Sequence, residues 1–162
     1  MDGAQVRSAR QSSTGKNEEA EMIWFADTSV LVPVFVPGHI HHERSFQLFS
    51  RATVKSAFCA AHSIAEVYAT MTRLPGKHRT SGQQALTFLE MIEKRFSFVA
   101  LDVADYLATI REAAAMGIVG GTSYDALVAA CALKAKADVL YTWNIERFSL
   151  LGDEVARKVR TP

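Results

Sequence analysis

The sequence predicts an α/β fold, a three-layer α/β/α sandwich around a mostly parallel central sheet. Two observations predict this fold. Short apolar runs alternate along the chain with longer stretches of helical period, which is the pattern of strand–helix–strand units. The first run, MIWFA at residues 22–26, is apolar throughout, as expected of a strand that is buried on both faces. The alternation continues to the last apolar run, so we expect one sheet with right-handed crossovers.

The strands and helices are expected in the following order. The first strand covers residues 22–26 and ends at Asp27, and two prolines interrupt the segment that follows. A helix over residues 40–51 would carry Phe46, Leu48 and Phe49 toward the core. The remaining elements are a strand at 54–60, helices at 63–73 and 80–95, a strand at 96–102, helices at 103–116 and 123–137, and a strand at 138–144.

The domain organisation is simple. Residues 1–21 lack hydrophobic periodicity and are rich in Ser, Gly, Gln and charge, so we expect a loose tail or extension before a single domain at 22–162. No apolar run approaches the ~20 residues of a membrane span, and the tail has no apolar core of a secretory signal. Cys59 and Cys131 both lie in apolar stretches, which is typical of buried free thiols. These features favour a cytoplasmic protein.

The charge balance restricts how nucleic acid could bind. The chain of 162 residues has a formal net charge of +1, so the field of the whole molecule would not attract phosphates. A local basic patch or a bound metal ion would have to do so.

Three carboxylates follow strand ends or open helices. Asp27 could cap the next helical turn, or it could bind a divalent cation at the sheet edge, where ligands of parallel sheets collect. Glu66 could complete a capping box with Ser63, or it could point out of the sheet edge from the first turn of its helix. Asp125 opens a helix, where the helix dipole favours an acid, but Gly120 and Gly121 before it are typical of a backbone that approaches a substrate.

Three motifs resemble one known family. They are FADTSVL at 25–31, SIAEVYATMTRLPG at 63–76 and SYDALVAACALKAKADVLYTWNIERF at 123–148. In this order and spacing they resemble the PIN domain, and within it the VapC-like toxin ribonucleases of type II toxin–antitoxin systems, over nearly all of residues 22–151. The resemblance implies a PIN-like α/β/α fold, endonuclease action on RNA, dependence on Mg²⁺ or Mn²⁺, homodimerisation and inhibition by a cognate antitoxin protein.

The resemblance also assigns residues. Asp27, Glu66 and Asp125 match the catalytic, metal-binding acids of the family. Its fourth acidic position corresponds to Asn144, which keeps an oxygen ligand but removes a charge. Thr28 and Thr142 are expected to support these residues, and Arg147 stands where some relatives place an acid. The implied reaction is hydrolysis of a phosphodiester by a metal-activated water.

Two further groups of side chains have competing interpretations. Arg73, Lys77 and Arg79 surround a Leu-Pro-Gly turn and could be either solvated or in contact with RNA phosphates. His39, His41 and His42 are expected at the surface and not in a zinc site, because adjacent ligands rarely converge.

Two other functions stay open. A catalytically weak PIN-fold module that binds RNA or an antitoxin is credible because of Asn144. A phosphotransferase with Asp27 as nucleophile is disfavoured, because the chain lacks the second acid of an Asp-x-Asp start.

Overall fold

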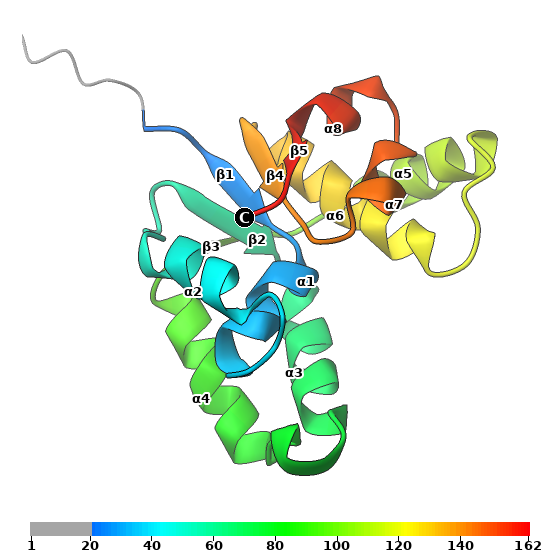
Figure 1. The fold of residues 1–162 in the computed structure, drawn as a ribbon. Coiled ribbons are helices and arrows are strands. Elements are labelled where there is room, and N and C mark those ends of the chain that lie inside the picture. Colours follow the sequence, from blue (N-terminus) through cyan, green and yellow to red (C-terminus); the bar gives the residue numbers. More distant parts are fainter. Residues whose placement is uncertain (1–20) are drawn as a thin grey trace, which may run out of the picture.

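The computed structural model describes residues 21–162 and contains one parallel sheet of five strands (Figure 1). The order across the sheet is β3-β2-β1-β4-β5. The strands are β1 (Trp24–Ala26), β2 (Ala57–Ala60), β3 (Ser97–Val99), β4 (Val139–Tyr141) and β5 (Val159–Arg160). The expected tail at 1–21 lies outside the described residues except for Glu21, so that prediction is untested.

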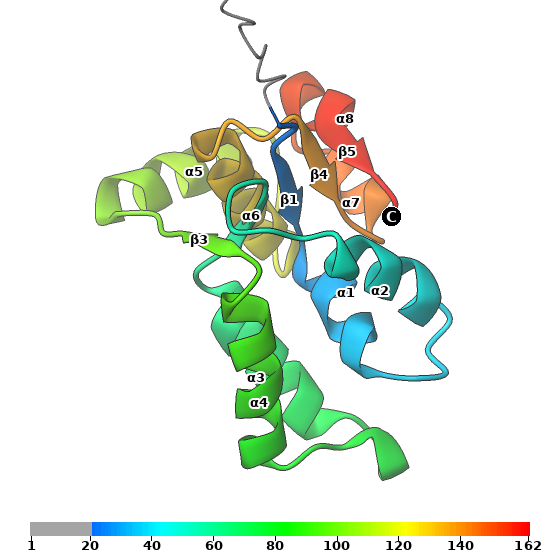
Figure 2. The same ribbon diagram turned by 90° about the vertical axis from the view of Figure 1, so that its left-hand side faces the viewer.

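Helices cover both faces of the sheet, which confirms the three-layer prediction (Figure 2). One face carries α1 (Thr28–Leu31), the 3₁₀ helix η1 (Val32–Phe35), α2 (His42–Ser50), α3 (Ser63–Arg73) and α4 (Gly82–Glu93). The other face carries α5 (Val103–Ala115), α6 (Thr122–Lys134), α7 (Ile145–Ser149) and α8 (Asp153–Lys158). A short 3₁₀ helix, η2 (Gly76–His78), links α3 to α4.

The central strand β1 explains why its sequence is apolar throughout. Trp24 and Ala26 pack into the core on the α1–α4 side, whereas Phe25 packs into the core on the α6 side. Successive side chains of a strand point to opposite faces, so a strand with helices on both faces needs apolar residues at every position.

The register of the sheet brings three strand ends together. Ala26 of β1 pairs with Cys59 of β2 and with Tyr141 of β4. The residues that follow these strands, Asp27 among them, therefore start from one edge of the sheet.

Every strand and helix that the sequence predicts is present. The helix at 63–73 has the predicted bounds, the helix predicted from 123 begins at Thr122, and the other elements are shorter than predicted. One of the two interpretations of Glu66 is excluded, and one detail of the helix prediction is wrong. Ser63 and Glu66 form no capping box, because α3 begins without a side-chain cap and Glu66 contacts another helix. Phe46 is 46% exposed, because it lies on the outer side of α2 and only Phe49 of that helix's aromatic residues is buried in the core. The sequence analysis did not predict α1, η1, η2, α7, α8 or β5.

Within residues 21–162, no helix has both the length and the apolar character needed to cross a bilayer.

Candidate active site

Asp27 lies immediately after β1 and is buried, with 4% of its surface exposed. Its Oδ2 accepts hydrogen bonds from Thr142 Oγ1 (2.9 Å), Ser29 Oγ (2.7 Å) and the Ser29 backbone N–H (3.4 Å). Asp27 is thus the N-cap of α1, as one interpretation of the sequence expected. In the described residues no hydrogen bond reaches Oδ1, so this oxygen is free to bind a ligand.

Glu66 reaches the same region from the first turn of α3. Its Oε2 accepts a hydrogen bond from Thr28 Oγ1 at 2.7 Å, which links α3 to α1. Its Oε1 lies 4.0 Å from His62 Nε2. Burial lowers the pKa of His62 against the opposing pull of Glu66 and Asp27, so the ring is neutral at pH 7. Among the described residues, His62 therefore gives Glu66 no cationic partner on this side.

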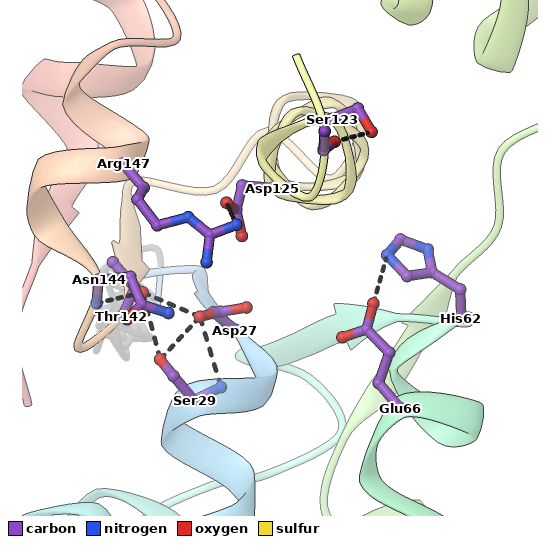
Figure 3. A network of polar contacts seen from close by, with 10 residues as sticks. Asp27, Ser29, His62, Glu66, Ser123, Asp125, Thr142, Asn144 and Arg147 are labelled. Atoms are coloured by element: carbon purple, nitrogen blue, oxygen red, sulfur yellow. Dashed lines mark hydrogen bonds and ion pairs between the residues drawn. The ribbon is translucent and has the colours of Figure 1, made fainter. Parts of the chain in front are cut away.

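Asp125 lies in the first turn of α6 and is also buried. Its Oδ2 forms an ion pair with Arg147 Nη2 of α7 at 2.6 Å, yet it accepts no hydrogen bond of acceptable geometry. Figure 3 shows the guanidinium of Arg147 extending toward this carboxylate, with Asp27 and Asn144 nearby. Burial raises the pKa of Asp125 to about 6, against the opposing effect of Arg147 and with smaller contributions from Asp27 and Glu66. Asp125 is therefore an acid whose charge is only partly compensated.

Thr142 and Asn144 follow β4 and complete the arrangement. Thr142 is fully buried, and its Oγ1 donates to Asp27 and accepts from the Asn144 backbone N–H at 3.0 Å. Ser29 Oγ lies 3.3 Å from the same hydroxyl and accepts from the Trp143 backbone N–H. One hydroxyl thus fixes the ends of β1 and β4 relative to each other.

The carboxylates and their neighbours line a cavity of about 290 Å³, which we call the carboxylate pocket. The four residues predicted to be catalytic, Asp27, Glu66, Asp125 and Asn144, all line it. Thr28 also lines it, and Thr142 lies behind it through its bond to Asp27. Residues from all four connections between strands therefore meet at the carboxyl edge of the sheet, where parallel α/β sheets bind their ligands.

The oxygen donors in this pocket suit a hard divalent cation, which takes carboxylate and amide oxygens. The buried Asp125 Oδ2 accepts no hydrogen bond, so it is another oxygen that suits binding of such a cation. Among residues 21–162, however, no three His, Cys, Asp or Glu side chains lie close enough together to hold a metal ion. The carboxylates repel one another, and Arg147 and Thr28 hold Asp125 and Glu66 in other contacts.

The other predicted residues lie elsewhere. Arg73 ends α3, and Lys77 and Arg79 lie in and just after η2, so all three are outside the lining of the carboxylate pocket. His39 is exposed and His41 and His42 are partly exposed, and their contacts differ, since His42 Nδ1 contacts the Pro33 carbonyl while His41 stacks on Trp143. They do not converge on a metal site.

Four residues of the site were not assigned from sequence. Ser29, Tyr124 and Arg147 lie within the three motifs that carry the family resemblance, so their positions were a usable signal. Tyr124 lies beside Asp125 and lines the pocket, with 61% of its surface exposed. His62 had no local signal, because only the fold places it beside Glu66.

Comparisons with known proteins agree on one family. The family model described as PIN domain matches residues 24–150. The chain is 35% identical over 114 residues to Ribonuclease VapC40 of Mycobacterium tuberculosis, which is 70% of this chain and 81% of that protein. It is 31% identical over 116 residues to Ribonuclease VapC27 of the same organism, which is 70% of this chain and 79% of that protein.

Solved structures share the fold at lower identity. A DNA-bound VapBC from Salmonella typhimurium superposes with a TM-score of 0.61 at 16% identity, over 86% of this chain and 98% of that chain. VapBC2 from Rickettsia felis, bound to a DNA fragment from its promoter, gives a TM-score of 0.60 at 17% identity, with the same coverage.

Proposed function

The chain belongs to the PIN-domain family, and from this premise we propose that it is an endoribonuclease that depends on Mg²⁺ or Mn²⁺ and acts as the toxin of a toxin–antitoxin pair. The observation that carries the proposal is the convergence of Asp27, Glu66, Asp125 and Asn144 on the carboxylate pocket. The relatives at 35% and 31% identity are named ribonucleases, which supports RNA as the substrate.

We propose Asp27, Asp125 and Glu66 as the metal ligands, with Asn144 as a neutral fourth oxygen donor. A bound Mg²⁺ or Mn²⁺ would lower the pKa of a water molecule and neutralise charge on the phosphodiester. Asp27 is the best-positioned ligand, because three hydrogen bonds hold Oδ2 and leave Oδ1 free. Glu66 lines the pocket and can orient the attacking water through Oε1.

Thr28 and Thr142 act as positioning residues in this scheme. Thr28 Oγ1 donates to Glu66 and Thr142 Oγ1 donates to Asp27, so each hydroxyl fixes one carboxylate. Fixed ligands reduce the reorganisation needed when substrate binds.

We propose RNA and a cognate antitoxin as partners, a second copy of the chain as a further one, and the cytoplasm as the compartment. The structural neighbours named VapBC support the antitoxin. A second copy is supported by α5, where Val103, Leu107 and Ile110 are 75%, 48% and 43% exposed. Their spacing places these three side chains on one face of the helix, and such exposed apolar faces are typical of interfaces.

The test compares the wild type with Asp27→Asn on a panel of structured RNAs, with Mn²⁺ or with EDTA. Asn is chosen because it preserves the N-cap of α1. We expect metal-dependent cleavage by the wild type and a loss of at least about a hundredfold in the variant. Asp153→Asn, at an exposed position of α8, is the matched control and should keep full activity. Full activity in Asp27→Asn would remove the proposal.

The substrate is then identified in cells. RNA ends mapped after brief induction of the wild type and of Asp27→Asn should differ at a defined set of cleavage sites. Identical end maps would contradict the nuclease assignment.

A second candidate is a PIN-fold module that binds RNA or an antitoxin without cleaving. Asn144 in place of an acid and the Arg147–Asp125 ion pair favour it, because both reduce the negative charge available to a cation. In that case wild type and Asp27→Asn would bind the RNA panel equally and neither would cleave it with any metal.

A further inference from the structure

A second pocket adjoins the carboxylate pocket on the α1 side. It has a volume of about 440 Å³, and it shares Thr28, Ser29 and Asn144 with the carboxylate pocket. Its remaining walls include His39, Ile40 and His41 of the loop before α2, Thr70 of α3 and Trp143 after β4. We call it the side pocket. Because the two cavities share three lining residues, one ligand can extend from one cavity into the other.

The side pocket has a preformed aromatic wall. The rings of His41 and Trp143 stack with centroids 3.8 Å apart and an interplanar angle of 8°. Trp143 Nε1 donates to the buried Ser45 Oγ at 3.0 Å, and its backbone N–H donates to Ser29 Oγ at 3.0 Å. The indole hydrogen bond and the stack on His41 fix the orientation of the Trp143 ring, so the wall is formed before any ligand binds.

The chemistry of the walls suits a planar, weakly polar ring. Burial, together with His39 and Arg44 nearby, lowers the pKa of His41, so this imidazole is neutral at pH 7. Thr70 and Asn144 bring a hydroxyl and an amide, which can donate to or accept from the edge of a base. Ile40 lines the pocket and is 88% exposed, so its side chain does not pack in the core and is available to contact a ligand.

Charge near the pocket suits a phosphate. The guanidinium of the exposed Arg44 lies 5.6 Å from the centre of the Trp143 ring. A basic group beside an aromatic wall is the combination that single-stranded nucleic acid requires, since bases stack and phosphates pair with cations.

We propose that the side pocket binds one unpaired nucleotide of the RNA, adjacent to the phosphodiester held at the carboxylate pocket. The inference rests on the proposed function and deepens it, because it makes the side pocket a determinant of which single-stranded sites are cleaved. Unpaired bases can be splayed out and stacked on aromatic side chains, whereas bases inside a duplex cannot enter a pocket of this kind.

The first test uses the two tryptophans as reporters. In a ¹⁵N-labelled protein with EDTA, the two indole N–H signals belong to Trp24 and Trp143, and Trp24→Phe identifies them. We expect titration with AMP, GMP, CMP and UMP to shift the Trp143 signal with at least one nucleotide. The Trp24 signal should stay in place, because Trp24 is 5% exposed and lies in the core. A Trp143 signal that no nucleotide moves would overturn the proposal.

The second test fills the pocket. Thr70→Phe places a ring in the side pocket from α3 and replaces none of the carboxylates, and Thr72→Phe is the matched control, since Thr72 lines neither pocket. We expect Thr70→Phe to raise the Kd for fluorescein-labelled RNA pentanucleotides and the KM for cleavage by about tenfold, the effect of losing one stacked base. The Mn²⁺ affinity and kcat should stay within about twofold of the wild type. Equal Kd and KM in the two Phe variants would refute the inference.

The two proposals can fail separately. If the wild type cleaves RNA with metal while the nucleotides and Thr70→Phe have no effect, the side pocket is not an RNA site and the nuclease assignment survives. If neither wild type nor Asp27→Asn cleaves RNA while the Trp143 signal shifts and Thr70→Phe weakens pentanucleotide binding, the side pocket binds nucleotides and the nuclease assignment fails.

Discussion

Replacement of Arg147 by Met should strengthen binding of a divalent cation. Arg147 places a positive charge 2.6 Å from Asp125 Oδ2, at the carboxylate that a metal ion would need. Methionine keeps an unbranched apolar side chain and removes the charge. The metal ion then no longer competes with the guanidinium for Asp125, and the two cations no longer repel each other.

The magnitude follows from the contact. A 2.6 Å pair has a Coulomb energy of about 6 kcal/mol at an effective dielectric constant of about 20. The Arg147 side chain is 46% exposed, so solvent screening and desolvation remove most of this energy and about 1 to 2 kcal/mol remains. We therefore expect the Kd for Mn²⁺ to fall about 5- to 30-fold. The metal-free variant should lose thermal stability, because Asp125 would be left beside Asp27 and Glu66 without a cation.

Isothermal titration with Mn²⁺ measures the affinity, and thermal melts with EDTA and with Mn²⁺ measure the stability. Arg157→Met, at an exposed position of α8, is the matched control and should change neither quantity. If the Arg147→Met variant is folded and binds Mn²⁺ with unchanged or weaker affinity, Arg147 does not compete with the metal ion.

Three further predictions follow from other parts of the structure. The pKa of Asp125 is raised to about 6 in the folded protein, above the value near 4 of an unfolded chain, so the folded state binds more protons between these values. The free energy of unfolding of the metal-free protein should therefore fall by about 1 to 2 kcal/mol as the pH rises from 4 to 7, as measured by urea titrations with EDTA. Asp125→Asn should remove this pH dependence. If the pH dependence persists in the variant, it belongs to another group. Phe148→Ala should lower the free energy of unfolding by about 3 to 5 kcal/mol, because the ring is fully buried, whereas Leu150→Ala, at a side chain that is 65% exposed, should stay within about 0.5 kcal/mol. If Lys77 and Arg79 contact single-stranded RNA phosphates, the double replacement by Ser should reduce the slope of log binding constant against log salt concentration by about 1.4, and an unchanged slope would place RNA elsewhere.

The parts of the fold that sequence predicted are those with a long or uniform pattern. Residues 22–26 are apolar at every position, and α6 has a pattern of more than ten residues, so both were recognisable. The elements α1, η1, α7 and α8 have four to six residues each, too few for a period to show. Pro33 also disfavours a helix when only the sequence is considered. In the structure it lies at an early position of η1, where its missing N–H loses no hydrogen bond.

The candidate site was predictable as a set of residues and not as a set of contacts. The strand end at Asp27 and the helix start at Asp125 indicated an edge of the sheet, which the register confirms for Asp27. Of the two interpretations of Glu66, the capping box with Ser63 does not form, because the hydroxyl of Thr28, from a distant segment, binds the Glu66 carboxylate. Contacts between residues that are 38 or 115 positions apart depend on the whole topology, and no local pattern encodes them.

The outer strands of the sheet have a consequence for self-association. β3 at one border has three residues and β5 at the other has two. An exposed border strand can recruit a strand from another molecule, and the shorter it is, the fewer backbone groups it offers for this purpose. A dimer of this protein is therefore expected to join helix to helix and not to extend one sheet across two molecules.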